Sequence, residues 1–99
     1  MQETEFRVLR ECDLSRAEKQ IEDACSALGL HVAMKTSLAK HPGSVHWHYK
    51  NGKQSGTLEL TLLASHRRIW AQEQNRRKAE WIDATLPKVQ RSIERAIKA

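Results

Sequence analysis

The sequence contains no apolar run approaching the roughly 20 residues that a membrane-spanning helix needs. Its N-terminus is charged and lacks the apolar core of a signal peptide. It has only two cysteines, Cys12 and Cys25, and their spacing fits neither a metal site nor a disulfide framework. These absences predict a reduced, cytoplasmic protein that makes no contact with membranes.

Motifs that mark catalytic sites are also missing. The sequence has no nucleophile elbow, no glycine-rich loop to cradle a phosphate and no paired carboxylates. The only candidates for acid–base chemistry are His46 and His48, and no motif supports them. We therefore expect neither enzymatic activity nor a bound cofactor.

Charge is abundant and unevenly spread. The 99 residues, enough for one domain with a modest core, carry 17 basic and 12 acidic side chains, a net charge of +5. Residues 1–30 hold 4 basic and 7 acidic groups, residues 31–66 hold 4 and 1, and residues 67–99 hold 9 and 4. A basic excess in the later two thirds favours an anionic partner. Solvated surface charge is an equally common explanation.

Apolar and polar residues alternate in four segments, the pattern of strands with one buried and one exposed face. These segments are residues 32–38, 45–49, 57–62 and 68–72. His41-Pro42-Gly43 is predicted to end the first strand, because proline cannot donate to a strand ladder. Asn51-Gly52 marks the turn after the second. The four strands would form an antiparallel meander.

Two helices are predicted to flank this meander. The first begins at Asp13 or Ser15, where Ser15 and Glu18 fit a capping box, and Gly29 stops it. Cys25 lies on its apolar stripe, so we expect a buried structural thiol.

The second helix is predicted to begin near Asn75 and to run to Ile97. Pro87 lies inside it and should kink it, or restart it near residues 85–86, because proline lacks a backbone donor.

The predicted fold class is α+β, a two-layer sandwich of helix, four-stranded antiparallel meander and helix, with both helices on one sheet face. Residues 13–99 would form this single domain, and residues 1–12 an N-terminal arm or a short edge strand. The buried face of the sheet is marked by Leu58, Leu60 and Leu62.

The open face of the sheet is predicted to carry four side chains of interest. They are His46, His48, Thr61 and Trp70. The orientation of Trp70 depends on the turn at residues 65–66: an even turn pairs Ile69 with Leu62 and directs Trp70 outward, and an odd turn buries it. Odd hairpin loops favour a glycine that is missing here, so we favour the outward orientation.

Histidine spacing raises the question of a metal site. His46 and His48 point to the same side of one strand, and Glu59 or His31 could add a third ligand for zinc. Two ligands without a third in register are a weak signal, and exposed strand histidines are the simpler explanation. We predict no metal site.

Basic residues gather at both ends of the fourth predicted strand, roughly 20 Å apart. The predicted phosphate-binding cluster consists of Lys50, Lys53, Arg76, Arg77 and Lys78. The second basic cluster consists of Lys40, His41, His66, Arg67 and Arg68. Cations at a helix start oppose the helix dipole, whereas a bound phosphate would be attracted there by cations and free amides together. Alternatively, the helix begins nearer Ala79 and these cations are simply solvated.

This outline resembles a double-stranded-RNA-binding domain, which has a helix, antiparallel strands and a second helix. That family also has a loop with proline and histidine, and a lysine cluster that opens the last helix. The residues that carry the resemblance are His41-Pro42-Gly43 and Arg76-Arg77-Lys78-Ala79. The chain departs from the family in having four predicted strands and an acidic outer face on the first helix, where that family meets the minor groove. We do not assign it to the family.

The sequence therefore predicts a small basic module that binds nucleic acid, RNA or DNA, with phosphates held at the sheet ends and the open face meeting bases or backbone. The alternative is a domain for protein interaction or homodimerisation that uses the same open face.

Overall fold

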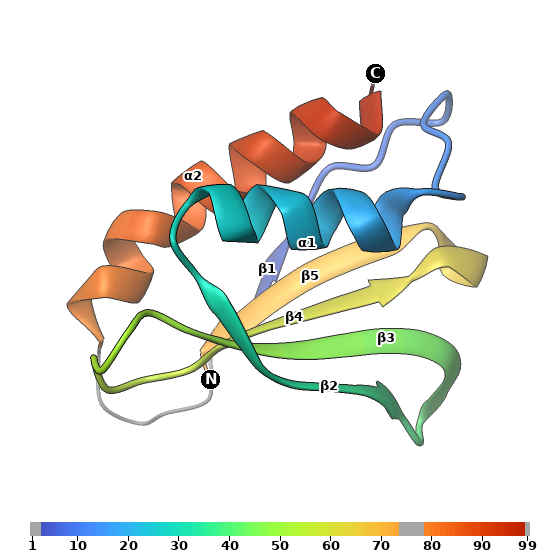
Figure 1. Ribbon diagram of the computed structural model, residues 1–99. Helices are drawn as coiled ribbons and strands as arrows, with labels where there is room; N and C mark the ends of the chain where they lie inside the picture. Colours follow the sequence, from blue (N-terminus) through green and yellow to red (C-terminus); the bar gives the residue numbers. More distant parts are fainter. Residues whose placement is uncertain (1–2, 74–78, 99) are drawn as a thin grey trace.

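The computed structural model describes residues 3–73 and 79–98. Its elements follow the order β1 (Glu3–Glu5), α1 (Ala17–Ala27), β2 (His31–Leu38), β3 (His41–Lys50), β4 (Leu58–Leu63), a short 3-10 turn (Ala64–His66), β5 (Arg68–Glu73) and α2 (Glu80–Lys98). The strands form one antiparallel sheet in the order β1-β5-β4-β3-β2. Both helices cover the same face of this sheet (Figure 1). The predicted α+β class and two-layer arrangement are confirmed.

The number of strands differs from the prediction, because the sheet has five strands and not four. The additional strand, β1, pairs with β5 from Glu3 opposite Gln72 to Glu5 opposite Trp70. Within the segment predicted as an N-terminal arm or a short edge strand, Glu3–Glu5 forms an edge strand. Three residues without apolar alternation give no recognisable strand pattern, and β1 is held partly by the ion pair of Glu5 with Arg68, 2.7 Å long.

The first hairpin turns earlier than predicted. The turn lies at residues 39–40, and His41-Pro42-Gly43 is the beginning of β3, not the end of the first strand. The register between β2 and β3 is irregular between Thr36 and Leu38, and Gly43 has a φ of +85°. A bulge of this kind accepts proline and glycine inside a strand, because the ladder is already interrupted there.

The first helix begins later than predicted. Its N-terminal flanking residue is Arg16, which makes no side-chain cap, so the capping box of Ser15 and Glu18 does not form. Ser15 instead lies in a preceding turn, where its backbone N–H donates to Asp13 Oδ1 at 2.9 Å. Gly29 ends the helix as predicted, with a φ of +83°.

The second helix is unbroken from Glu80 to Lys98 and continues through Pro87. The restart that we predicted near residues 85–86 does not occur, since a single missing backbone donor removes only one hydrogen bond from a helix held by packing. The predicted cap Asn75 lies outside the described residues. None of the described helices combines the length and the apolar character that crossing a bilayer requires.

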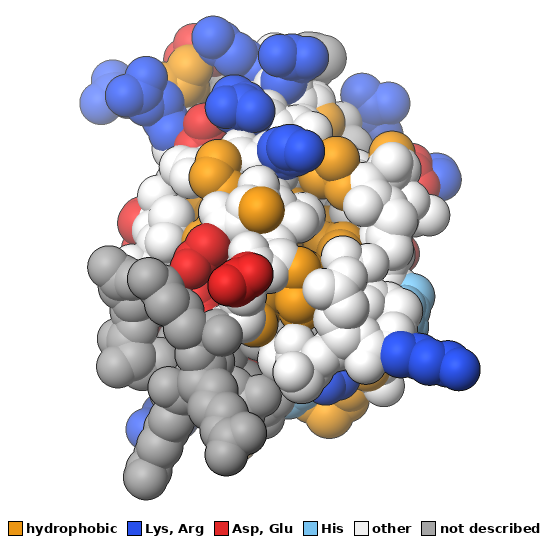
Figure 2. Space-filling view, turned by 90° about the vertical axis from the view of Figure 1, so that its left-hand side faces the viewer, with side chains coloured by type: hydrophobic (Ala, Val, Ile, Leu, Met, Phe, Trp, Pro, Cys, Tyr) orange, Lys and Arg blue, Asp and Glu red, His pale blue; other side chains and the backbone are white. Residues whose placement is uncertain are grey.

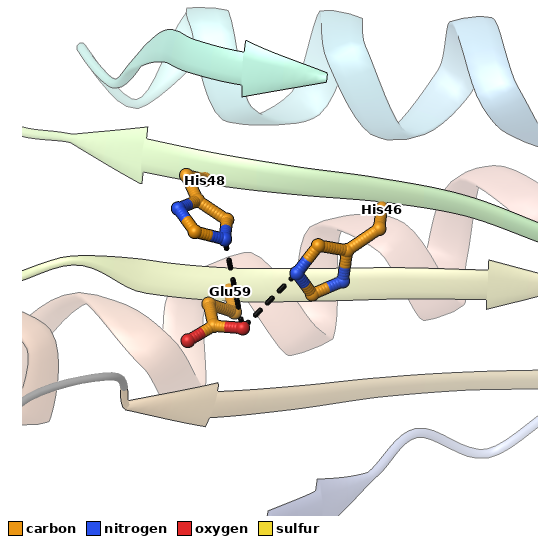
Figure 3. A group of neighbouring side chains, drawn as sticks. All are labelled: His46, His48 and Glu59. Atoms are coloured by element: carbon orange, nitrogen blue, oxygen red, sulfur yellow. Dashed lines mark ion pairs between the residues drawn. The ribbon is translucent and has the colours of Figure 1, made fainter. Parts of the chain in front are cut away.

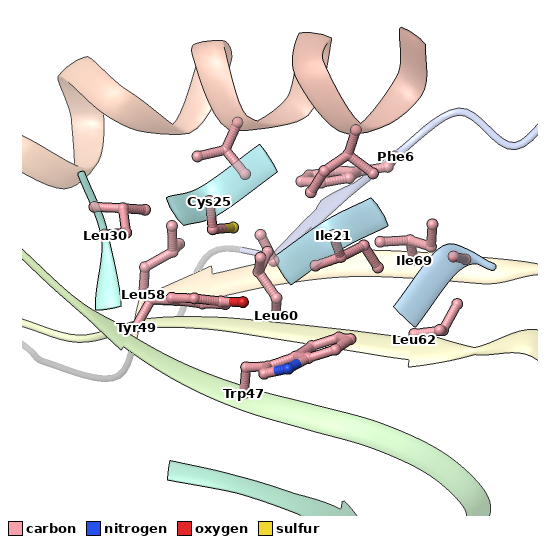
Figure 4. Packing of buried hydrophobic residues seen from close by; sticks show 14 of the residues in the cluster. Phe6, Ile21, Cys25, Leu30, Trp47, Tyr49, Leu58, Leu60, Leu62 and Ile69 are labelled. Carbon is pink, nitrogen blue, oxygen red and sulfur yellow. The ribbon is translucent and has the colours of Figure 1, made fainter. Parts of the chain in front are cut away.

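The core lies between the sheet and the two helices, as Figure 4 shows. Leu58, Leu60 and Leu62 face it together with Trp47 and Tyr49, which confirms the predicted buried face. The β4–β5 hairpin has the register predicted for an even turn, in which Leu62 lies opposite Ile69 and Thr61 lies opposite Trp70.

Cys25 is also part of this core. Burial raises the pKa of its thiol to about 12, so the thiol stays protonated and unreactive in the folded protein. This agrees with a structural role for the residue.

Candidate functional site

Three polar side chains meet on the face of the sheet opposite the helices. His46 and His48 project from β3 and Glu59 from the neighbouring strand β4 (Figure 3). Both imidazoles approach the same carboxylate oxygen: Glu59 Oε1 lies 3.0 Å from His46 Nε2 and 3.7 Å from His48 Nε2. We call these three residues the open-face triad.

The triad is enclosed far more than an exposed strand face would be. His46 is only 5% exposed, and its Nδ1 lies 2.8 Å from the hydroxyl of Thr61, which is itself 1% exposed. Burial lowers the pKa of His46, although the Glu59 carboxylate acts in the opposite direction. Our expectation of exposed histidines is therefore wrong.

His46 and Glu59 border a pocket of about 370 Å³ that is also lined by residues of the turn between β2 and β3. The turn between β2 and β3 lies over the open face, and the His41 ring meets the Trp70 ring edge-on with centroids 5.6 Å apart. We call this the open-face pocket; its lining includes Leu38, Lys40, His46, Glu59, Thr61 and Trp70. Trp70 points to the open side as predicted, but it is only 4% exposed because the hairpin covers it.

The residues of the second predicted basic cluster make contacts with different parts of the protein. Arg67 donates through Nη2 to the carbonyl oxygens of Leu9 and Cys12, each at 2.8 Å. Arg67 follows the 3-10 turn directly and has a left-handed backbone conformation, with a φ of 53°. These bonds hold the segment after β1 against the sheet.

The other members of that cluster lie apart from Arg67. The guanidinium of Arg68 pairs with Glu5 and lies 4.4 Å above the centre of the Trp70 ring. Lys40 and His41 line the open-face pocket, and His66 meets the hydroxyl of Ser65 at 3.0 Å. The structure therefore brings Lys40, His41 and Arg68 to Trp70, and leaves Arg67 with the N-terminal segment.

The predicted phosphate-binding cluster is described only in part. Lys50 is half-buried at the end of β3 and Lys53 is exposed in the turn that follows, whereas residues 76–78 lie outside the described residues. The loop after β3 packs against the start of α2, where Trp81 Nε1 donates to the Ser55 carbonyl at 2.8 Å.

Sequence reasoning missed a second pocket, between the N-terminal segment and the C-terminal half of α2. It has a volume of about 270 Å³, and we call it the basic pocket. It is lined by Arg7, Leu9, Cys12, Arg91, Glu94, Arg95 and Lys98. Figure 2 shows Lys and Arg side chains gathered on the helical side of the molecule.

Part of this pocket was visible in the sequence. Arg91, Arg95 and Lys98 recur at spacings of four and three, which places them on one face of a helix. Arg7 could not have been found in this way, because only the tertiary structure brings it to α2. Its backbone N–H donates to Glu94 Oε2 at 2.8 Å.

Comparison of the chain with known proteins finds no match to a protein family, to a curated protein or to a solved structure. The resemblance to double-stranded-RNA-binding domains thus has no support beyond its short motifs.

Proposed function

We propose that the protein is a small nucleic-acid-binding module that holds phosphate groups in the basic pocket. The observation that carries the proposal is that four cationic side chains and only one carboxylate line a single pocket. Guanidinium and ammonium groups that converge in this way match the oxygens of a phosphate. The pocket volume, about 270 Å³, is many times the roughly 30 Å³ that a water molecule occupies.

The cationic side chains of the basic pocket remain available to a ligand. Among the described residues, Arg7, Arg91, Arg95 and Lys98 form no ion pair, whereas Lys19, Lys35 and Arg68 on other surfaces all do. The single carboxylate, Glu94, already accepts bonds from the backbone of Arg7 and from Gln90 Nε2. The pocket therefore keeps a net positive charge for a ligand.

Helix stability accounts for only part of this arrangement. Arg95 and Lys98 lie in the last turn of α2, where cations favourably oppose the negative end of the helix dipole. Arg91 lies before that turn and Arg7 is not on a helix, so the dipole gives no reason for their presence. Binding of an anion gives a reason for all four.

A polyanion fits the charge distribution better than a small anion does. α2 has 19 residues and is therefore roughly 28 Å long at about 1.5 Å per residue. The basic pocket lies at its C-terminal end, and the loop that carries Lys53 packs against its start. Only an extended ligand such as a nucleic acid would reach both ends.

The test is the salt dependence of binding to duplex and single-stranded RNA and DNA. Replacing Arg91 and Arg95 with glutamine should weaken binding and reduce the slope of log K against log salt by about one unit per lost contact. A second variant, Lys50→Gln with Lys53→Gln, removes the same charge from the cluster predicted from the sequence and tests whether the ligand also contacts the start of α2. Binding with an unchanged salt slope in the Arg91/Arg95 variant would rule out the basic pocket as the phosphate site.

The alternative function, homodimerisation, is favoured by a different observation. The first seven residues of β2 are exposed, and it is an edge strand whose second edge has no partner strand in the described chain. Its apolar side chains Val32 and Met34 are 44% and 41% exposed. An exposed edge with apolar side chains invites pairing with another strand. The surface for this function is thus the β2 edge, since the hairpin turn covers part of the open face.

Light scattering after gel filtration tests this alternative. If β2 edges pair, the protein should be a dimer whose stability changes little with salt, and Met34→Glu should shift it to the monomer by placing charge in the interface. Gln54→Glu places the same charge in an exposed loop outside β2 and is the matched control. A monomeric wild-type protein at all concentrations would exclude the alternative.

A further inference from the structure

We propose that the open-face triad is a binding site for a divalent transition metal of the Zn²⁺ class. Zinc in proteins takes imidazole nitrogen and carboxylate oxygen ligands, and a set of two histidines and one glutamate leaves a coordination position open. The proposal is independent of nucleic-acid binding, because the triad lies on the sheet face opposite the helices.

The sheet brings the three ligands together through its register. His48 lies directly opposite Glu59 in the β3–β4 ladder, and His46 lies opposite Thr61, two pairs further along. Every second residue along a strand lies on the same face of the sheet, and side chains directly opposite on neighbouring strands lie close together. The ligands thus stand on two rigid, adjacent strands of the sheet, not on loops.

The distances suit a metal ion. The candidate ligand atoms of the three residues all lie within 4.8 Å of one another. Bonds of about 2.0–2.2 Å at tetrahedral angles separate ligand atoms by roughly 3.4 Å. The two distances to Glu59 Oε1, 3.0 Å from His46 and 3.7 Å from His48, lie on either side of this separation. The imidazole nitrogens, which lie within 4.8 Å of each other, would move closer together around a bound ion.

A neighbouring hydroxyl orients one ligand. Thr61 Oγ1 lies 2.8 Å from His46 Nδ1, which leaves Nε2 of the same ring directed at Glu59. Imidazoles that bind metals commonly use their second nitrogen in this way, and the partner fixes both the tautomer and the ring orientation. Thr61 is therefore a positioning residue for the site.

Charge provides a further argument. The Glu59 side chain is 13% exposed, and its ion pairs within the described residues are with His46 and His48 alone. A largely buried carboxylate is costly unless a cation compensates it. A divalent metal bound between Glu59 and the two imidazoles would supply that positive charge.

The open-face pocket connects the triad with its surroundings. His46 and Glu59 line the open-face pocket, whereas His48 is not part of that lining. The open coordination position would therefore face a space of about 370 Å³, large enough for water or a small ligand.

The test is calorimetric titration of Zn²⁺ into the untagged full chain, accompanied by thermal melting. One ion should bind per chain and raise the melting temperature, whereas Mg²⁺, which prefers all-oxygen sites, should not. Thr61→Val should weaken Zn²⁺ binding by roughly 10–100-fold, and loss of a ligand in His48→Gln or Glu59→Gln should weaken it more.

Controls separate the site from nonspecific binding by histidine. His66→Gln removes an imidazole outside the triad and should leave Zn²⁺ affinity unchanged, as should Arg91→Gln with Arg95→Gln. Circular dichroism establishes that each variant is folded, and the visible absorption of Co²⁺ in the wild-type protein reports the coordination geometry without any mutation. No saturable Zn²⁺ binding, or equal affinity in wild type and in both folded ligand variants, would overturn the proposal.

Discussion

Leu60→Ala is expected to lower the free energy of unfolding by roughly 2–5 kcal/mol. Leu60 is fully buried in the centre of the sheet, on the face that packs against the helices. Its truncation removes buried methyl groups and leaves a cavity that the neighbouring strands cannot close, because both are fixed by ladder hydrogen bonds on either side of β4. Urea denaturation measures the loss as a lower midpoint at unchanged slope.

Val32→Ala is the matched control for this prediction. It also shortens an aliphatic side chain on a strand, but Val32 is 44% exposed and lies on an edge strand. Val32→Ala should lower the free energy of unfolding by less than about 1 kcal/mol, because much of the Val32 side chain stays in contact with water in the folded protein. Equal losses for the two variants would mean that the core does not lie where the structure places it.

Thr61 shows where sequence reasoning stops. Its position between Leu60 and Leu62 predicts the open face correctly, because the period of a strand is strictly two. The same pattern predicts an exposed side chain, yet Thr61 is 1% exposed and hydrogen-bonded to His46. Thr61→Ala should therefore cost about 1–3 kcal/mol by leaving a buried polar atom without its partner.

The burial of the open face comes from a feature that has no local signature. A bulged hairpin carries Leu38 and His41 over the sheet to contact the region of Trp70. Alternation reports which side of a strand a residue occupies, but not whether another segment covers that side. Alternation alone therefore predicts a row of exposed residues where the structure has the enclosed triad.

The basic pocket was missed for a related reason. Helical spacing reveals Arg91 and Arg95 as neighbours, but the segment that carries Arg7 follows a three-residue strand without a recognisable pattern. The strand β1 and the bonds of Arg67 to the carbonyl oxygens of Leu9 and Cys12 fix the course of this segment. Such long-range contacts are decided by the whole fold.

Gly56→Ala is expected to destabilise the protein by at least about 2 kcal/mol, from two separate causes. Gly56 has a φ of +99°, a region that costs a residue with a side chain roughly 1–3 kcal/mol. An added methyl group would also lie 2.6 Å from the Cβ atom of Ala79, immediately before α2, and relieving that contact by moving backbone costs a further 1–3 kcal/mol or so.

Two matched variants separate these causes. Gly52→Ala, in the same loop, has a φ of +59° and open space around the added methyl group, so it should cost only about 1–2 kcal/mol. Ala79→Gly removes the atom that the new methyl group would strike, and should therefore recover part of the loss when combined with Gly56→Ala. A purely additive double variant would show that the close approach of loop and helix makes no contribution.

The result also bears on how the two ends of α2 are related. Gly56 allows the loop after β3 to approach the start of α2, where the Trp81 indole holds the carbonyl of Ser55. If that contact fixes the helix, Gly56→Ala should also disturb the basic pocket at the far end and weaken nucleic-acid binding below the unfolding temperature. If binding is unchanged while stability falls, the C-terminal half of α2 is held in place by its own core residues, Val89, Ile93 and Ile97.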